Sequence, residues 1–372
     1  MSEFKLTTVE EFEAATERLL ETGAKVGADA WQFRVKNQTP HCKFGEEGVC
    51  CRICAMGPCR ITKKAPRGIC GCDVHGIVGR NYLKFTAGGS ATHSDHGREI
   101  CHTLYESSAD GCYQVKDPEK LIRIAKEWGV ETEGKDIYDL AHEVAEMGLW
   151  EYGKPFGTQR FLKRAPQSQQ ELWEKNELAP RAIDREVSCS LHMAHMGCSS
   201  LPEALIKQSI RAGLSDGWGG SMMGTEFSDV LFGTPKPIDT EANLGVMVEE
   251  NVNIVVHGHD PSLSEMVCEY ADSPEMIAYA KEMGAKGITV SGVCCTSNEV
   301  AMRRGIPMAG NFLQQENVVL TGACEAIVVD VQCIFPALGP LSKCFHTKFI
   351  TTSPIAQMPD SEFIRFDAKT AD

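Results

Sequence analysis

The chain has 372 residues, of which 42% are hydrophobic and 24% are charged, and its formal net charge is −14 at pH 7. This length exceeds what one hydrophobic core usually supports, so we expect two or more domains. The acidic balance argues against nucleic acid or an anionic membrane as the main partner. No apolar run is long enough to span a bilayer, and the charged N-terminal stretch lacks the apolar segment of a secretory signal. We therefore expect a cytoplasmic protein, in which 17 cysteines favour metal binding or catalysis over disulfides.

The first part of the chain, residues 1–240, is predicted to be a helical domain. Thr8 and Glu11 form a capping-box pattern, and apolar residues then recur at helical spacing as far as Gly23. Helical periodicity returns after residue 72 in several segments. It ends in a stretch rich in glycine and proline, so we place the domain boundary near 236–245.

A cysteine-rich segment at residues 41–72 interrupts this helical pattern and is expected to be mostly loop. Its seven cysteines are Cys42, Cys50, Cys51, Cys54, Cys59, Cys70 and Cys72. Thiolates at such spacing can hold iron–sulfur clusters, which bind four cysteines each. Adjacent cysteines point in different directions, so Cys50 and Cys51 are not expected to serve one cluster. The segment therefore predicts two cluster sites and an anaerobic or strongly reducing environment.

Residues 241–372 are predicted to form a Rossmann-like parallel α/β domain. Apolar strands are expected at residues 251–258, 287–293, 326–333, 347–353 and 361–367. Strands rich in valine and isoleucine that alternate with helices indicate a parallel sheet covered on both faces. The expected fold class is thus a helical cluster-binding domain followed by an α/β domain.

Histidine and cysteine side chains follow three of these strands. The first strand is followed by His257 and His259, the second by Cys294 and Cys295, and the third ends at Cys333. Ligands of parallel sheets bind outside the carboxyl ends of the strands, so these residues are expected to share one edge. Mixed imidazole and thiolate donors suit iron, nickel or zinc. Equally, the cysteines could be small buried residues with no ligand.

A third pattern is HSDHGREICH, which contains His93, His96 and His102. Steps of three and six keep these residues near one face of a helix. Imidazoles exchange protons near neutral pH, so the pattern favours a proton relay or a metal site. A solvated helix face is the alternative interpretation.

Several motifs together resemble the nickel–iron carbon monoxide dehydrogenases of anaerobes. They are GVCCRICAMGPCRI, GICG, HSDHGRE, DGWGGSM, FGTPKP, HGHDP, GVCCTSNE and VDVQCIFP. The resemblance extends along essentially the whole chain. The hybrid-cluster proteins share some of these elements but fit less well.

The resemblance implies three metal centres. Cys42 and Cys50 would bind a cluster at a two-fold axis, shared with the same pair of a second subunit. A [4Fe–4S] cluster within one subunit would be held by Cys51, Cys54, Cys59 and Cys70. His259, Cys295 and Cys333 would bind iron atoms of a catalytic nickel–iron–sulfur cluster. Cys72 falls outside the pattern and is interpreted as a bystander, although it could replace Cys70.

The implied reaction is the oxidation of carbon monoxide with water to carbon dioxide, two protons and two electrons. His93, His96 and His102 match the proton-relay helix, and electrons would leave to a ferredoxin-like acceptor. The implied assembly is a homodimer, with acetyl-CoA synthase as a further candidate partner. Glu99 departs from the family, which often has histidine there. A carboxylate, with a pKa of about 4.3, relays protons less well than an imidazole, at about 6.5.

The chain also ends where family members continue into a domain with three more cysteines. We therefore expect only part of the catalytic ligand set here, and doubtful activity for this chain alone. Two alternatives stay open: an electron-transfer or metal-sensing iron–sulfur protein, and a hybrid-cluster-type reductase. Retention of His259, Cys295 and Cys333 argues against the first. The pair Cys42 and Cys50 argues against the second.

Overall fold

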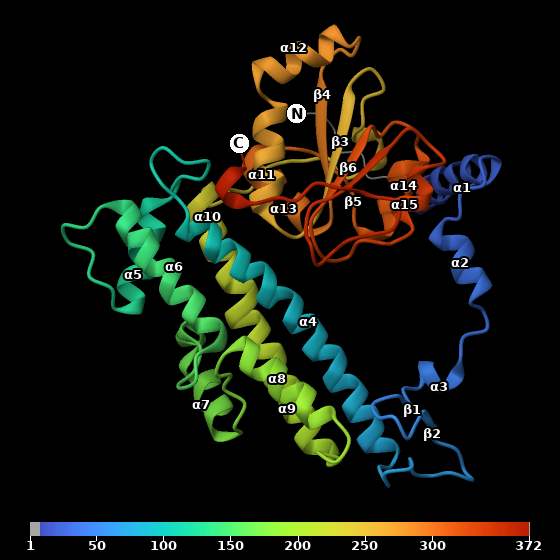
Figure 1. Cartoon of the computed structure of the whole chain (residues 1–372), viewed down its shortest axis with the longest axis vertical. Helices are drawn as coiled ribbons and strands as arrows, with labels where there is room; N and C mark the ends of the chain where they lie inside the picture. Colours follow the sequence, from blue (N-terminus) through green and yellow to red (C-terminus); the bar gives the residue numbers. More distant parts are fainter. Residues whose placement is uncertain (1–7, 372) are drawn as a thin grey trace. The chain divides into compact units, whose positions relative to one another are not determined.

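The computed structural model describes residues 8–371, which divide into two units. Residues 40–233 form a helical unit, and residues 8–39 join 234–371 in a unit that contains a parallel sheet (Figure 1). The fold class predicted from the sequence, helices followed by a parallel α/β sheet, is confirmed. The sequence places residues 8–39 in the helical domain that was expected to end at residue 240. In the structure these residues belong to the unit that contains the sheet.

The helical unit is organised around α4 (Val74–Tyr105), a 32-residue helix. The carboxylate of Asp73 accepts the backbone N–H of Gly76 and so caps its first turn. The other elements are α3 (Lys43–Glu46), α5 (Pro118–Trp128), α6 (Ile137–Gly153), η1 (Arg160–Arg164), α7 (Gln167–Lys175), α8 (Ile183–Ala194), α9 (Pro202–Ser215), η2 (Asp216–Ser221) and α10 (Met222–Phe232). Four helices, α6, α8, α9 and α10, pack along α4. Leu83, Ala194 and Leu205 form one apolar cluster between α4, α8 and α9.

The element η2 is a π-helical turn that continues α9 into α10. It carries the motif DGWGGS, whose small residues let this segment approach α4 closely. A Cβ atom at Gly220 of η2 would lie 3.0 Å from the backbone of His93, and one at Gly224, in the first turn of α10, would lie 2.9 Å from Nε2 of His96. The glycines therefore fix the separation between this segment and the histidine face of α4.

The sheet has six parallel strands in the order β5-β4-β3-β6-β7-β8. They are β3 (Val252–Gly258), β4 (Ile288–Val293), β5 (Met308–Gly310), β6 (Ala326–Val329), β7 (Lys348–Thr351) and β8 (Glu362–Phe363). Five of them lie where the sequence predicts strands. The sequence does not predict β5, because three residues without a valine or isoleucine run give no periodic signal. From β3 the chain proceeds to β4 and β5 on one side, then crosses to β6 on the other, so the strand order reverses beside β3.

Helices cover both faces of the sheet, as the sequence predicts. On one face, Val256 of β3 and Val290 of β4 pack with α11 (Pro261–Ala271) and α13 (Cys294–Arg304). On the other face, Val255 and Ile327 pack with α14 (Gln315–Leu320) and α15 (Leu338–Ser342). The remaining elements of this part are α12 (Pro274–Glu282), η3 (Leu244–Val246), η4 (Phe312–Gln314) and η5 (Ala368–Thr370). Neighbouring residues of one strand thus enter opposite cores.

Residues 8–39 add α1 (Val9–Lys25) and α2 (Trp31–Asn37) to the α/β unit. The predicted capping box is present, since Thr8 and Glu11 exchange side-chain and backbone hydrogen bonds. Leu19 and Leu20 pack against the core that contains α14. An amphipathic helix has an apolar face to bury, but its periodicity does not identify the partner, which is why the sequence assigns this helix to the wrong unit. Among residues 8–371, no helix combines the length and apolarity needed to cross a membrane.

Candidate metal centres

The cysteine-rich segment forms a small antiparallel hairpin rather than only loop. Its strands are β1 (Cys50–Cys51) and β2 (Cys59–Arg60), with Cys51 paired to Cys59. The side-chain amide of Asn81 on α4 donates to the carbonyl oxygens of Gly48 and Cys50, both at 2.9 Å. These two hydrogen bonds fix the hairpin on the first turns of α4.

Five cysteines line one hollow beside this hairpin. They are Cys51, Cys54, Cys59, Cys70 and Cys72. The backbone N–H of Ile69 donates to Sγ of Cys59 at 3.4 Å. The structure thus brings together the four cysteines predicted for one [4Fe–4S] cluster, with Cys72 as a fifth.

The two cysteines of the GICGC turn differ in their environment. Cys70 is exposed, and the backbone N–H of Cys72, followed by the Arg80 side chain, lowers the pKa of its thiol. Cys72 is buried, and this burial raises the pKa of its thiol. A Cβ at Gly76 would lie 2.6 Å from Sγ of Cys72, so this sulfur packs against the first turns of α4. Of the two thiols, Cys70 therefore loses its proton more readily.

Cys42 and Cys50 are not among the residues that line the hollow. Cys42 is exposed at the start of α3, and Cys50 is half-buried. Because Cys50 and Cys51 are adjacent in β1, their side chains leave opposite faces of the hairpin. This geometry agrees with the expectation that the two cysteines serve different sites.

At the carboxyl edge of the sheet, His259 follows β3 in a turn held by Asp330. The buried carboxylate of Asp330 accepts the backbone N–H groups of His259 at 2.6 Å and Asp260 at 2.9 Å. Burial away from water raises the pKa of Asp330, and the backbone donors oppose this effect. Gly258 has φ +136°, and a Cβ there would overlap Oδ1 of Asp330. The turn therefore requires glycine before His259.

Cys294 and Cys295 begin α13 directly after β4. Gly258 and Cys294 form a parallel bridge, which places the start of α13 beside the turn that carries His259. Cys294 is buried, and its burial raises the pKa of its thiol to about 12, with the nearby Cys333 thiol as the next contribution. Cys295 is exposed, and burial of part of its thiol followed by the charge of Cys333 raises its pKa. The exposed thiol of the pair is the one that the sequence assigns to a metal.

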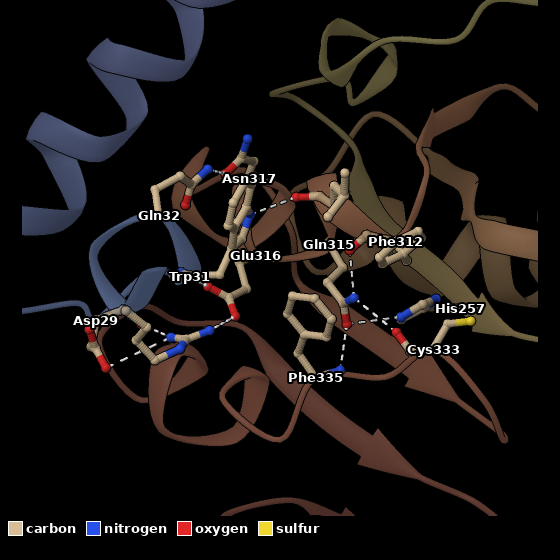
Figure 2. A network of polar contacts seen from close by, with 12 residues as sticks. Asp29, Trp31, Gln32, His257, Phe312, Gln315, Glu316, Asn317, Cys333 and Phe335 are labelled. Carbon is tan, nitrogen blue, oxygen red and sulfur yellow. Dashed lines mark hydrogen bonds and ion pairs between the residues drawn. The ribbon is translucent and has the colours of Figure 1, made fainter. Parts of the chain in front are cut away.

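The sequence predicts that Cys333 ends a strand, and this prediction is wrong, because β6 already ends at Val329. It lies in the following turn, where Gln332 and Cys333 both have positive φ angles, 70° and 59°. Figure 2 shows the contacts that hold this turn. Nε2 of Gln315 donates to the carbonyl oxygen of Cys333 at 2.9 Å, and its Oε1 accepts the N–H of Phe335 at 2.7 Å. Gln315 thus fixes the backbone on both sides of residue 334.

The same amide oxygen of Gln315 lies 3.1 Å from Nε2 of His257. Burial lowers the pKa of His257 to about 4, so its imidazole is neutral near pH 7. Since an amide oxygen only accepts, Nε2 of His257 carries the hydrogen. His257, one of the histidines of the HGHDP motif, is therefore part of the support for the Cys333 turn.

His93, His96 and His102 all lie on α4, but their environments differ. His96 is buried, His93 is half-buried and His102 is exposed. Nδ1 of His93 lies 2.6 Å from Oδ1 of Asp216 in the π-helical turn, and this hydrogen bond raises the pKa of His93. Asp216 is a residue that the sequence pattern did not single out. Its signal was the DGWGGS motif, which had no assigned role.

The donor sets suit clusters better than single ions. Among residues 8–371, no three His, Cys, Asp or Glu side chains are arranged to hold one metal ion. An iron–sulfur cluster has a different requirement, since its cysteines surround an inorganic core and accept N–H groups on sulfur. The sulfur-lined hollow, with the N–H of Ile69 directed at Cys59, meets this requirement.

The chain is similar to known proteins along almost its whole length. Residues 49–372 match the model of the Prismane/CO dehydrogenase family. The chain is 46% identical to carbon monoxide dehydrogenase 1 of Methanosarcina mazei, covering 96% of this chain and 58% of that protein. It is 41% identical to the beta subunit of the carbon monoxide dehydrogenase/acetyl-CoA synthase of Moorella thermoacetica, covering 90% of this chain and 50% of that protein.

Among solved structures, the nickel-free carbon monoxide dehydrogenase from Thermococcus sp. AM4 is similar, with a TM-score of 0.93 and 48% identity. The match covers 95% of this chain and 57% of that one. The chain thus spans between half and three fifths of the length of these relatives.

Proposed function

Because the chain belongs to the Prismane/CO dehydrogenase family, we propose that it carries metal centres of a nickel–iron carbon monoxide dehydrogenase. The reaction would be CO + H2O → CO2 + 2 H⁺ + 2 electrons. What supports this proposal is the position of His259, Cys295 and Cys333 in the chain, each after a strand at the carboxyl edge of one sheet. They follow β3, β4 and β6, which are neighbours in the sheet and flank the point where strand order reverses.

These three residues would hold iron atoms of the catalytic nickel–iron–sulfur cluster. When bound, this cluster would supply an electrophilic metal site that activates carbon monoxide and water. The contribution of the chain's own residues is to hold the turns that carry His259 and Cys333. Asp330 holds the backbone of His259, and Gln315 holds that of Cys333, so the turns that carry both side chains are fixed by the chain itself.

The protons released would be accepted by imidazoles of α4. His93 is suited to this role, since Asp216 orients its ring and stabilises its protonated form. His96 and His102 lie further along the same helix and would extend the route. Glu99 is exposed on α4 in place of a further histidine.

The electrons would leave through the cysteine-rich hairpin. Cys51, Cys54, Cys59 and Cys70 would hold a [4Fe–4S] cluster, which their shared hollow supports. Cys42 and Cys50 lie outside this hollow and would share a cluster with the same pair of a second copy, making a homodimer. The acceptor would be a ferredoxin-like protein in the cytoplasm. The relative from Moorella thermoacetica, named as part of an acetyl-CoA synthase assembly, makes that enzyme a candidate partner.

Metal content and activity of variants test this proposal. Protein purified without oxygen is analysed for iron and nickel and for the reduction of a viologen dye by carbon monoxide. We expect Cys333→Ser and His259→Ala to lower nickel content and dye reduction while most iron stays. Cys59→Ser should remove iron from the hairpin instead, and Cys112→Ser, outside all proposed centres, should change neither metal.

The result that contradicts the proposal is iron without nickel and without dye reduction in the unmodified protein. That result would favour the electron-transfer alternative, in which only the hairpin cluster operates.

A further inference from the structure

Arg80 is a buried cation at the cysteine hollow. It lies in the second turn of α4, and only 3% of its surface is exposed. It lines the hollow together with the five cysteines. Its Nε donates to the backbone carbonyl of Ser199 at 2.7 Å.

In the part of the chain that the structure describes, no carboxylate forms an ion pair with Arg80. Other arginines with restricted solvent access do have such a partner: Arg181 pairs with Glu186, and Arg304 pairs with Glu265. Burying a guanidinium without a negative partner is costly. A carbonyl oxygen offers a dipole but no charge, so the bond to Ser199 does not balance the cation.

The groups that face Arg80 are thiols. Cys70 and Cys72 line the same hollow as Arg80, together with Cys51, Cys54 and Cys59. Four thiolates around an iron–sulfur core carry a net negative charge, which increases when the cluster takes up an electron. Net charge and hydrogen bonds to sulfur are among the factors that set the reduction potential of such clusters.

We propose that Arg80 is the countercharge of the cluster held by Cys51, Cys54, Cys59 and Cys70, and that it raises the reduction potential of this cluster. This inference rests on the cluster assignment of the proposed function. In the step concerned, the oxidised cluster accepts one electron, and no bond forms or breaks. The fixed positive charge stabilises the more negative, reduced state, so electrons enter this cluster more readily than they would without Arg80.

The test is a redox titration of the full chain, with dithionite as reductant and the electron paramagnetic resonance signal of the reduced cluster as readout. Loss of the signal in Cys59→Ser assigns it to this cluster. Arg80→Gln removes the charge but keeps an amide donor for Ser199, and Arg80→Lys keeps the charge. The matched control is Arg60→Gln, since Arg60 directly follows Cys59 but is exposed and lies over the ring of Phe44.

We expect Arg80→Gln to lower the ratio of reduced to oxidised cluster about tenfold at a fixed potential, which is a shift of about 59 mV for one electron. Arg80→Lys should shift the potential by less than half as much, and Arg60→Gln should leave it near the original value. An unchanged potential in Arg80→Gln, or an equal shift in Arg60→Gln, would overturn the inference.

If Arg80→Gln does not retain its cluster, the iron content of Arg80→Lys shows whether the charge of Arg80 is what the cluster requires. Retention of the cluster by the lysine variant supports a role of charge, whereas its loss there as well shows that only the shape of the guanidinium matters and contradicts the inference. The absence of any [4Fe–4S] signal from the unmodified protein would instead contradict the proposed function itself.

Discussion

Gln315 and Cys333 are joined by a hydrogen bond of 2.9 Å from the side-chain Nε2 to the backbone carbonyl. Gln315 begins α14, whereas Cys333 lies in the turn after β6, so the bond connects two elements of the α/β unit (Figure 2). The bond matters because Gln332 and Cys333 both adopt left-handed backbone conformations, which residues other than glycine rarely adopt without support. The backbone of Cys333 is thus held by a glutamine 18 residues earlier.

Replacement of Gln315 with leucine should destabilise the chain by about 3 kcal/mol, because several buried polar groups of the turn lose their partner. The measurement is urea unfolding of the metal-free protein. The matched control is Gln357→Leu, which changes an exposed glutamine of the same unit. Equal unfolding midpoints for the two variants would show that the amide of Gln315 does not hold the turn.

Gly258→Ala should be among the most destabilising single changes in the α/β unit. The new Cβ would overlap Oδ1 of Asp330, and φ at this position is +136°. Gly284→Ala separates these two effects, since Gly284 also has a positive φ, +99°, but has open space around it. We expect a loss of about 1 kcal/mol for Gly284→Ala and more than about 4 kcal/mol for Gly258→Ala. Thermal unfolding of both variants measures the difference, and similar losses would contradict the crowding at Asp330.

Asp216→Asn should lower the pKa of His93. The hydrogen bond with Asp216 raises this pKa, and a neutral amide stabilises the imidazolium less. Because the pKa of His93 is higher in the folded state than in the unfolded state, the pair stabilises the fold fully below the unfolded pKa of about 6.5. This contribution disappears as the pH rises through the folded pKa.

Asp216→Asn should therefore cost more stability at about pH 5.5 than at about pH 8.5, on either side of the ordinary histidine pKa. Titration of the His93 ring by NMR measures the pKa directly, and urea unfolding at the two pH values measures the stability. Asp95→Asn is the control, since Asp95 is an exposed carboxylate of the same helix paired with Arg98. An equal cost of Asp216→Asn at both pH values would contradict the ion pair.

Arg34→Ala should weaken the attachment of residues 29–37 to the α/β unit. Arg34 forms an ion pair with the buried carboxylate of Glu316, which also accepts the backbone N–H of Trp31 at 2.6 Å. Without Arg34 this carboxylate is left with backbone donation alone, a loss of about 2 kcal/mol for a partly exposed pair. Arg18→Ala, on the exposed side of α1, is the control.

Limited proteolysis between residues 25 and 40 measures this attachment. Faster cleavage in Arg34→Ala than in Arg18→Ala is expected. Equal rates would indicate that the ion pair does not hold the segment.

Much of the α/β unit could be predicted because its signals are local. Runs of valine and isoleucine identify β3, β4 and β6, and short apolar segments identify β7 and β8. The general rule for the carboxyl ends of parallel strands is sufficient to place His259 and Cys295 at one edge. The short strand β5 and the early end of β6 were not predicted. A strand of three residues is too short to show a periodic pattern, and a turn that directly follows an apolar run does not interrupt that run.

The roles of polar residues were less predictable. Asp216, Gln315, Asp330 and Arg80 are ordinary residue types at positions where a solvent-exposed side chain would fit the sequence pattern equally well. Each acquires its partner from a segment far along the chain: Asp216 meets His93, Asp330 meets the backbone of His259, and Arg80 meets the carbonyl of Ser199. The position of α1 on the α/β unit has the same origin, because an apolar helix face can pack on any complementary core.

The sequence by itself thus determined the fold class, the spacing of the cysteines and the presence of histidine and cysteine residues after the strands, since these follow from local periodicity and from residue order. Tertiary structure alone decided which thiols share a hollow, which buried charges lack a carboxylate, and which side chains hold the Cys333 and His259 turns. The physical reason is that burial and hydrogen-bond partners depend on contacts between segments that no local pattern records.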